Sequence, residues 1–173
     1  MRAWAPHYRH DAWAAALADF GVEDERLAHD LADRFGHERR ARHAVFRDSV
    51  PALEWARSQN YKLALITNGA PCLQREKLAA SQLERYFDVV LISGECGIGK
   101  PAFPIFMQAL ELLGIHAEEA TMVGDSIERD IDGARAAGLR GIWINRFRRL
   151  PSSSRPPSVI ETLHGLPGAL AAM

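Results

Sequence analysis

Four short apolar runs, separated from one another by helical patterns, constrain the fold of this chain more than any other feature. The runs have the length of buried strands, and the segments between them repeat apolar residues at the spacing of an amphipathic helix. This alternation predicts parallel β-α-β units and therefore a doubly wound α/β fold. The predicted strands are residues 61–67, 87–93, 120–124 and 140–145, and the predicted helices between them are residues 71–81, 102–113 and 127–137.

The N-terminal part of the chain has a different pattern. It contains helical patterns without a strand, ended by Gly21 and kinked or divided at Gly36. Asp48 or Ser49 is then placed to cap a further helix. The predicted parts are a helical segment at residues 1–47, an α/β segment at residues 48–173 and, within the latter, a Pro/Ser-rich linker at residues 151–158 before a C-terminal turn or helix.

The composition argues against several classes of protein. With 47% hydrophobic and 25% charged residues, the 173-residue chain has the profile of a folded globular protein. A net charge of −1 gives no field that would attract nucleic acid, and no apolar run is long enough to span a membrane. Cys72 and Cys96 form neither a disulfide framework nor a metal-ligand spacing. We therefore expect a cytoplasmic protein without nucleic-acid or membrane partners.

Two carboxylates follow the third predicted strand. Asp125 comes directly after that strand, and Asp130 lies on the helix that begins in the same loop. In open α/β sheets, ligands bind beyond the carboxyl ends of the strands. Mg²⁺ commonly takes one or two protein carboxylates together with substrate phosphate. The pair is thus a candidate magnesium site, and the alternative is that Asp125 is only a helix N-cap.

Two further loops carry groups suited to a phosphate. Thr67, Asn68 and Gly69 end the first predicted strand, where a hydroxyl and backbone N–H groups can hold phosphoryl oxygens. Lys100 lies between the second strand and its helix, where an ammonium can neutralise a phosphoryl group. Taken alone, the first segment is also an ordinary turn, and the lysine is also an ordinary surface residue.

Taken together, the order and spacing of these segments resemble motifs two, three and four of the haloacid dehalogenase (HAD) superfamily. The segments are TNG at residues 67–69, GKP at 99–101 and GDSIERD at 124–130. The longer stretch TNGAPCLQREKL looks like the subgroup that includes N-acylneuraminate-9-phosphatase and related small-molecule phosphatases. The resemblance, which runs over about residues 50–146, implies a Rossmann-like core. It also implies that residues 1–47 are part of a helical cap inserted after the first strand.

The resemblance further implies a two-step phosphoryl transfer. An aspartate nucleophile forms an aspartyl-phosphate, and a second aspartate two residues later acts as general acid and base. Asp125 would bind Mg²⁺, while Asp130 would be either a ligand through water or the partner that orients Lys100. Thr67 and Asn68 would hold the phosphoryl oxygens, and Lys100 would offset the charge on the nucleophile and the phosphate.

The first motif of that family, an apolar strand ending in Asp-x-Asp-x-Thr, does not occur in these 173 residues. The one Asp-x-Asp is Asp130-Ile131-Asp132, which belongs to the fourth motif. We therefore expect the chain as it stands to be inactive, either as a truncated phosphatase or as a non-catalytic protein. The family's strand order also places the first strand between the predicted strands 61–67 and 120–124. Without that strand, these two would pair directly, accept a strand from elsewhere, or present open edges that give a poor fold and favour self-association.

Three functions remain open at this point. The first is a Mg²⁺-dependent phosphatase acting on a small phosphorylated metabolite. The second is a haloacid dehalogenase, which Asp125 argues against because those metal-free enzymes do not need a metal-binding carboxylate there. The third is a pseudoenzyme that binds a phosphate compound or a protein partner, which the missing first motif favours.

Overall fold

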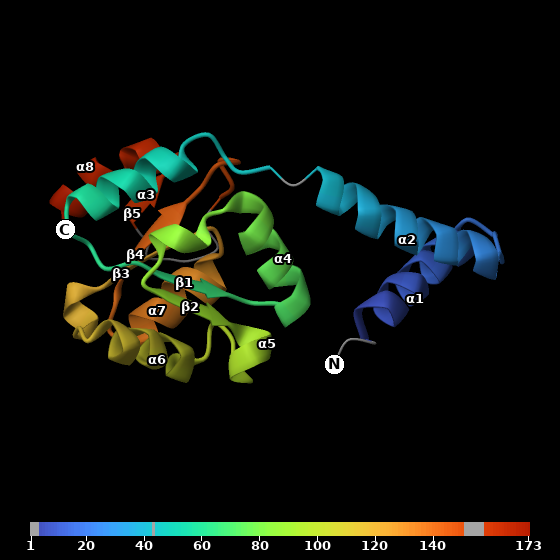
Figure 1. Ribbon diagram of the computed structural model, residues 1–173, viewed down its shortest axis with the longest axis horizontal. Helices are drawn as coiled ribbons and strands as arrows, with labels where there is room; N and C mark the ends of the chain where they lie inside the picture. The colour runs from blue at the N-terminus through green and yellow to red at the C-terminus, as the bar shows by residue number, and fades with distance from the viewer. Residues whose placement is uncertain (1–3, 43, 151–157) are drawn as a thin grey trace. The chain divides into compact units, whose positions relative to one another are not determined.

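The computed structural model describes residues 4–42, 44–150 and 158–173 of the chain (Figure 1). The linker predicted at residues 151–158 falls outside these ranges, except for Ser158, which begins a strand. In the part of the chain that is described, no helix is both long and apolar enough to cross a membrane. The chain divides into two compact units, which are described separately below.

The first unit, Met1–Ala44, is a helical hairpin. It consists of α1 (Trp4–Asp19) and α2 (Glu25–Ala41), whose contact includes the rings of Trp13 and Phe35. These rings meet edge to face with their centroids 6.3 Å apart, an arrangement that aromatic pairs favour. Apolar packing between the two helices therefore holds this unit together.

Local sequence sets the ends of these two helices. Gly21 has a φ of 73°, which a residue with a side chain rarely adopts, and it lies in the turn after α1. The Asp24 carboxylate accepts a hydrogen bond from the Leu27 N–H at 2.9 Å and so caps α2. Gly36 lies inside α2, so of the two predicted effects of this residue, a kink or a division of the helix, the division is wrong.

The second unit, Val45–Met173, is the predicted α/β structure, and its paired strands run parallel. Helices cover both faces, with α6 and α7 on one side and α3 and α8 on the other (Figure 1). The strands are β1 (Ala64–Thr67), β2 (Val89–Ile92), β3 (Thr121–Gly124), β4 (Arg140–Ile144) and β5 (Ser158–Ile160). The α-helices are α3 (Ser49–Ser58), α4 (Pro71–Ser81), α5 (Ser93–Cys96), α6 (Phe103–Leu113), α7 (Gly133–Ala136) and α8 (Leu166–Ala171), with 3-10 turns η1 (Glu84–Tyr86), η2 (Ala117–Glu119) and η4 (Leu163–Gly165).

The segment predicted as one helix over residues 127–137 is built in two pieces. It begins as a π-helical turn, η3 (Ile127–Asp132), and continues as the short α7. Gly138, with a φ of 84°, follows the helix end as predicted. Wide turns of this kind often occur at functional positions, and here the turn contains the buried Asp130.

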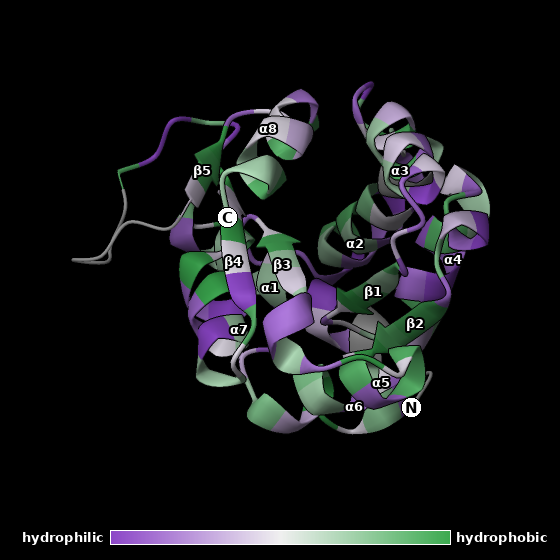
Figure 2. Cartoon of the chain, turned by 90° about the vertical axis from the view of Figure 1, so that its left-hand side faces the viewer, coloured by the Kyte–Doolittle hydropathy of each residue, from purple (hydrophilic) through white to green (hydrophobic). Residues whose placement is uncertain are grey.

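The parallel sheet is divided into two. β1 pairs with β2 in one sheet, while β3, β4 and β5 form another (Figure 2). Because alternate backbone groups of a strand point to opposite neighbours, half of those in β1 and β3 have no sheet partner among the described residues. The two strands that were predicted to border a missing strand have therefore not closed up, and each presents an open edge.

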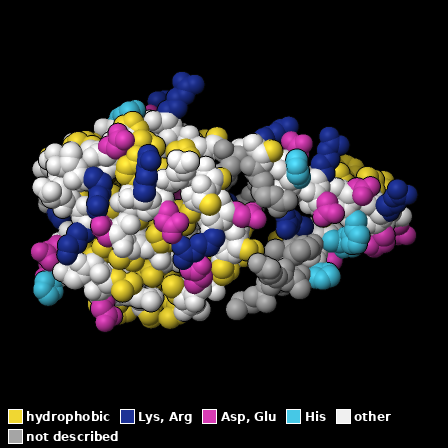
Figure 3. Space-filling model, viewed as in Figure 1, with side chains coloured by type: hydrophobic (Ala, Val, Ile, Leu, Met, Phe, Trp, Pro, Cys, Tyr) yellow, Lys and Arg dark blue, Asp and Glu magenta, His cyan; other side chains and the backbone are white. Residues whose placement is uncertain are grey.

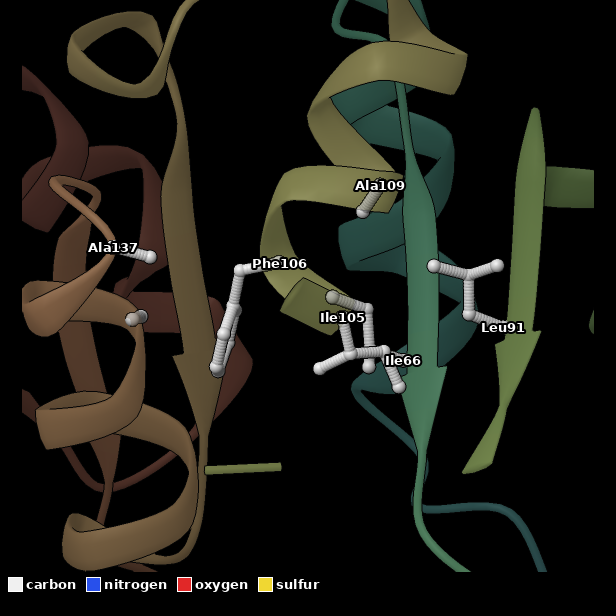
Figure 4. Packing of buried hydrophobic residues seen from close by; sticks show 7 residues of the cluster. Ile66, Leu91, Ile105, Phe106, Ala109 and Ala137 are labelled. Atoms are coloured by element: carbon white, nitrogen blue, oxygen red, sulfur yellow. The ribbon is translucent and has the colours of Figure 1, made fainter. Parts of the chain in front are cut away.

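Helix α6 connects the two sheets through a shared apolar core. Ile105 and Phe106 are fully buried in a cluster that includes Ile66 of β1 and Leu91 of β2. Figure 4 shows Ile105 beside Ile66, with Phe106 on the side of Ala137, which follows α7. Full burial of side chains this large contributes about 2 kcal/mol each to stability. The burial of Ile105 and Phe106 therefore contributes much of the apolar packing that holds the two sheets together.

The outer face of α6 is partly apolar, with Gln108 and Glu111 also exposed on it. Figure 3 shows hydrophobic side chains gathered on the lower part of the α/β unit, where α6 lies in this view. Phe103, Met107 and Leu112 of this helix are exposed. Isolated exposed apolar residues are ordinary, whereas a contiguous group favours association.

Asp48 precedes α3, yet its side chain does not cap that helix. Its carboxylate instead accepts two hydrogen bonds from the Arg146 guanidinium, at 2.8 and 2.9 Å, and one from the Leu163 N–H at 2.8 Å. The Arg146 guanidinium also lies 4.1 Å from the ring centroid of Phe46. Asp48 therefore ties the start of α3 to the loop after β4 and to η4.

We predict that Asp48→Asn lowers the free energy of unfolding by roughly 1.5–3 kcal/mol at neutral pH. The hydrogen bonds from Arg146 hold the pKa of this carboxyl below its usual range. Its contribution is therefore complete above the ordinary carboxyl pKa of about 4 and is lost as the pH falls through the lower pKa of the folded state. Urea unfolding between pH 6 and pH 3 should show the difference between parent and variant shrinking below about pH 4.

The matched control for this prediction is Asp88→Asn. Asp88 also accepts a backbone N–H, from Leu63 at 2.8 Å, and an arginine, Arg57, at 2.7 Å, but this ion pair is partly exposed. We expect a loss of less than about 1 kcal/mol there. Equal losses in the two variants would contradict the role assigned to Asp48.

Candidate functional site

The carboxyl ends of β1 and β3 carry the residues that the sequence singled out. Thr67 is the last residue of β1, and Gly124, before Asp125, is the last residue of β3. Lys100 comes from the loop between α5 and α6. Parallel strands present their carboxyl ends at the same edge, and the contacts below connect three of the predicted site residues there.

A buried ion pair is the centre of this edge. The Lys100 ammonium Nζ lies 2.7 Å from Oδ1 of Asp130, and only 12% and 6% of the two side chains are exposed. The other oxygen of Asp130, Oδ2, accepts the backbone N–H of Ser126 at 2.9 Å. Both carboxylate oxygens are therefore engaged, which is what a buried carboxylate requires. Of the two predicted roles for Asp130, this geometry matches the partner that orients Lys100.

Close backbone approach makes this pair possible. A Cβ atom on Gly124 would overlap the side chain of Asp130. The absence of a side chain at the end of β3 is what lets the Asp130 carboxylate lie against the strand. Gly124 therefore has a packing reason to be glycine that the sequence pattern alone did not show.

The Asn68 side chain binds the main chain of Lys100. Its Nδ2 donates to the Lys100 carbonyl at 2.7 Å, and its Oδ1 accepts the Lys100 N–H at 2.8 Å. These contacts occupy the Asn68 carboxamide, and the predicted binding of phosphoryl oxygens by backbone N–H groups of residues 67–69 stays a prediction. Asn68, Lys100 and Asp130 thus form one connected chain of polar contacts.

Gly69 is likewise held by the protein itself. Its N–H donates to Ser93 Oγ at 3.0 Å, and its carbonyl accepts the Gly94 N–H at 3.2 Å. Gln74 Nε2 donates to the Asn68 carbonyl at 3.2 Å from α4. Neither Ser93 nor Gln74 was predicted as a site residue. The position of Ser93 at the carboxyl end of the second predicted strand was the one available signal for it.

Asp125 is exposed at the end of β3, and its backbone carbonyl accepts the Trp143 indole N–H at 3.1 Å. It is not the N-cap of the following turn. That position belongs to Ser126, whose Oγ accepts the Arg129 N–H at 3.3 Å. The alternative interpretation of Asp125 as a helix cap is therefore wrong, and its carboxylate is left at the strand end.

The donors at this edge fit Mg²⁺ as a partial site. Among the described residues, no group of three or more His, Cys, Asp or Glu side chains could hold a metal by itself. Mg²⁺ does not need such a group, because it usually keeps several waters and takes one or two carboxylates plus substrate oxygens. One exposed carboxylate, Asp125, at the carboxyl end of β3 is compatible with that requirement.

Comparison with known proteins confirms the resemblance that the motifs predicted. The model of the haloacid dehalogenase-like hydrolase family matches residues 6–138. Phosphoserine phosphatase of Thermus thermophilus is 43% identical over 159 residues, which cover 92% of this chain and 63% of that protein. N-acylneuraminate-9-phosphatase of Mus musculus is 34% identical over 167 residues, covering 94% of this chain and 67% of that protein.

A solved structure of a 2-haloacid dehalogenase from Pseudomonas syringae pv. Tomato is also similar. It is 33% identical with a TM-score of 0.70, and the match covers 96% of this chain and 71% of that one. The chain therefore spans less than two thirds of the Thermus phosphatase and about two thirds of the mouse phosphatase.

We predict that Lys100→Met lowers the free energy of unfolding by roughly 3–5 kcal/mol, because it leaves the buried Asp130 carboxylate without its cation. Adding Asp130→Asn should recover part of this loss. The matched control is Arg148→Met, which breaks an ion pair with Glu161 whose side chains are 79% and 58% exposed. That loss should be at most about 1 kcal/mol. Urea unfolding measures the free energy of unfolding of each variant. Similar losses in Lys100→Met and Arg148→Met would contradict the prediction.

Proposed function

Because the chain belongs to the haloacid dehalogenase-like hydrolase family, we propose that its residues form the phosphate- and metal-binding part of a Mg²⁺-dependent phosphatase. One observation carries the proposal. A largely buried ammonium, Lys100, is fixed by Asp130 at the carboxyl edge of the strands, where the exposed Asp125 directly follows β3. A fixed cation and a metal-binding carboxylate are what a phosphoryl group and Mg²⁺ together require.

Each residue then has a separate task. The Lys100 ammonium has three N–H donors, so it can bind a phosphoryl oxygen while it stays on Asp130. Thr67, at the end of β1, would donate its hydroxyl to the phosphoryl group. Asp125 would hold Mg²⁺, which when bound would offset the charge of the phosphoryl oxygens.

The proposed substrate class is a small phosphomonoester. Two relatives are named for phosphoserine and for N-acylneuraminate 9-phosphate, which are both small phosphorylated metabolites. We propose no nucleic-acid or membrane partner, because the net charge is only −1. Self-association through the open edges of β1 and β3 stays a prediction.

We propose that these residues supply no nucleophile. The one Asp-x-Asp of the 173 residues includes Asp130, whose carboxylate already binds Lys100 and the Ser126 N–H. We therefore assign Asp130 to holding Lys100 and not to attack on phosphorus. We therefore propose that the 173 residues by themselves bind phosphate without turning it over. A non-catalytic binding protein is the alternative with the same geometry.

Dehalogenation is the second candidate reaction, since one similar structure is a 2-haloacid dehalogenase. The exposed Asp125 favours the phosphatase. A hydrolase that works without a metal has no need of a carboxylate at the end of β3, whereas Mg²⁺ binding requires one.

We predict that p-nitrophenyl phosphate hydrolysis occurs, and depends on Mg²⁺, only when the chain is extended upstream to the nearest in-frame start. The reason is that the family's nucleophile motif precedes the helical unit. The assay compares the extended and the 173-residue chains with and without Mg²⁺, and chloride release from 2-chloropropionate tests the competing reaction. Turnover by the 173 residues alone would contradict the prediction. Activity in neither chain, with both folded, would favour the binding protein.

A matched pair of variants tests Asp125 in the extended chain. Asp125→Asn should abolish the stimulation by Mg²⁺, because the amide offers the metal no charge. Asp132→Asn removes another exposed carboxylate from the same segment and should leave that stimulation unchanged. If both variants behave alike, Asp125 is not the metal-binding carboxylate.

A further inference from the structure

The Asn68 carboxamide makes an unusual pair of contacts for a residue at a binding edge. Nδ2 and Oδ1 bond, at 2.7 and 2.8 Å, to the carbonyl and the N–H of the same residue, Lys100. A neighbouring strand would engage these two backbone groups in the same way. The Asn68 side chain, at the end of β1, thus replaces the hydrogen bonds of a neighbouring strand for Lys100, which is 32 positions away in the sequence.

The loop that carries Lys100 needs such a partner. It contains Gly97, with a φ of 72°, and Gly99, which lies directly before the lysine. Glycines widen the range of backbone conformations, and in this segment neither a strand nor a helix includes Lys100. Without the two bonds from Asn68, the lysine backbone would rest on few local contacts, such as the bond from the Ala102 N–H to the Gly99 carbonyl at 3.0 Å.

The contact is also tightly packed. A Cβ atom on Gly99 would lie 2.8 Å from Oδ1 of Asn68 and 2.8 Å from Cβ of Ser93. Real Cβ atoms do not approach other atoms so closely, so the loop follows the Asn68 side chain as closely as its backbone allows. The hydrogen bond from Gln74 to the Asn68 carbonyl, at 3.2 Å, anchors Asn68 in turn.

The contact crosses the division in the sheet. Asn68 follows β1 in the first sheet, and Asp130 follows β3 in the second. Lys100 bonds to Asn68 through its main chain and to Asp130 through its ammonium at 2.7 Å. Asn68, after β1, holds the Lys100 backbone, and the turn after β3 holds the Asp130 carboxylate. The Lys100 ammonium reaches that carboxylate only if the lysine backbone keeps its position relative to β1.

We propose that the Asn68 side chain positions Lys100 and is not itself a ligand of the phosphoryl group. Its carboxamide sets where the ammonium lies, and it acts on a bound phosphate only through that ammonium. The inference rests on the proposed function only for the part that concerns phosphate. The positioning of the Lys100–Asp130 pair stands on the contacts themselves.

A double-mutant cycle tests the proposal in the 173-residue chain. The variants are Asn68→Ala, Lys100→Gln and both together, since glutamine removes the charge but can still donate to Asp130. Titration with orthophosphate in the presence of Mg²⁺ gives the affinities. Asn68→Ala should weaken phosphate binding on the order of tenfold when Lys100 is present, and less than about twofold when it is combined with Lys100→Gln. Equal weakening in both backgrounds would overturn the proposal, because it would make Asn68 a direct ligand.

Thr67→Ala is the matched control, because Thr67 is proposed to touch the phosphoryl group itself. It should weaken binding by a similar factor with or without the lysine charge. If Asn68→Ala does not unfold cooperatively, Asn68→Ser replaces it in the cycle, since serine keeps a short polar side chain.

Unfolding by urea gives a second readout that needs no phosphate. The effects of Asn68→Ala and Lys100→Gln on the folding equilibrium constant should be coupled on the order of fivefold, because loss of the carboxamide already loosens the ion pair. Additive effects would overturn the proposal. If the parent chain binds no orthophosphate, the proposed function fails, and this coupling alone decides the inference.

Discussion

The ion pair between Lys100 and Asp130 is the contact on which the arrangement of the carboxyl edge depends. The α/β unit consists of two sheets that share no strand in the described residues, so backbone hydrogen bonding does not fix one half against the other. Apolar packing by α6 holds the two sheets together but does not fix how one sheet is oriented against the other, because the hydrophobic effect is non-directional. The Lys100–Asp130 pair, with its atoms 2.7 Å apart and the second Asp130 oxygen accepting the Ser126 N–H, is a directional contact that fixes this orientation at the carboxyl edge.

Much of the fold followed from the sequence because it depends on local patterns. Short apolar runs predicted β1 to β4, and these strands are real, although β1 begins at Ala64 and not at Tyr61. The sequence also predicted that the strand expected between β1 and β3 does not occur in these residues, but it left open whether these two strands would pair directly, and they do not. The π-helical turn Ile127–Asp132 did not, because the helical spacing of apolar residues does not distinguish a wide turn from an α-helix.

The site was harder to predict than the fold, because its side chains form hydrogen bonds and ion pairs with residues far away in the sequence. Asn68 and Lys100 were both singled out, but a bond between residues 32 positions apart leaves no trace in either local pattern. Asp125 and Ser126 are adjacent residues of similar capping ability. Which of them caps η3 depends on the backbone at the end of β3, where Ser126 takes the Arg129 N–H.

The charges at this edge explain why a phosphate and a divalent cation would bind together. Asp125 and Asp130 as carboxylates and Lys100 as an ammonium sum to −1, so a phosphate dianion alone would meet repulsion. A divalent cation held by Asp125 would change that sum to +1, and the dianion would then return it to −1. Each ligand lowers the electrostatic cost of binding the other, and this coupling is reciprocal by thermodynamic necessity. Asp130 takes part in it only through Lys100, because its own oxygens are already satisfied within the protein.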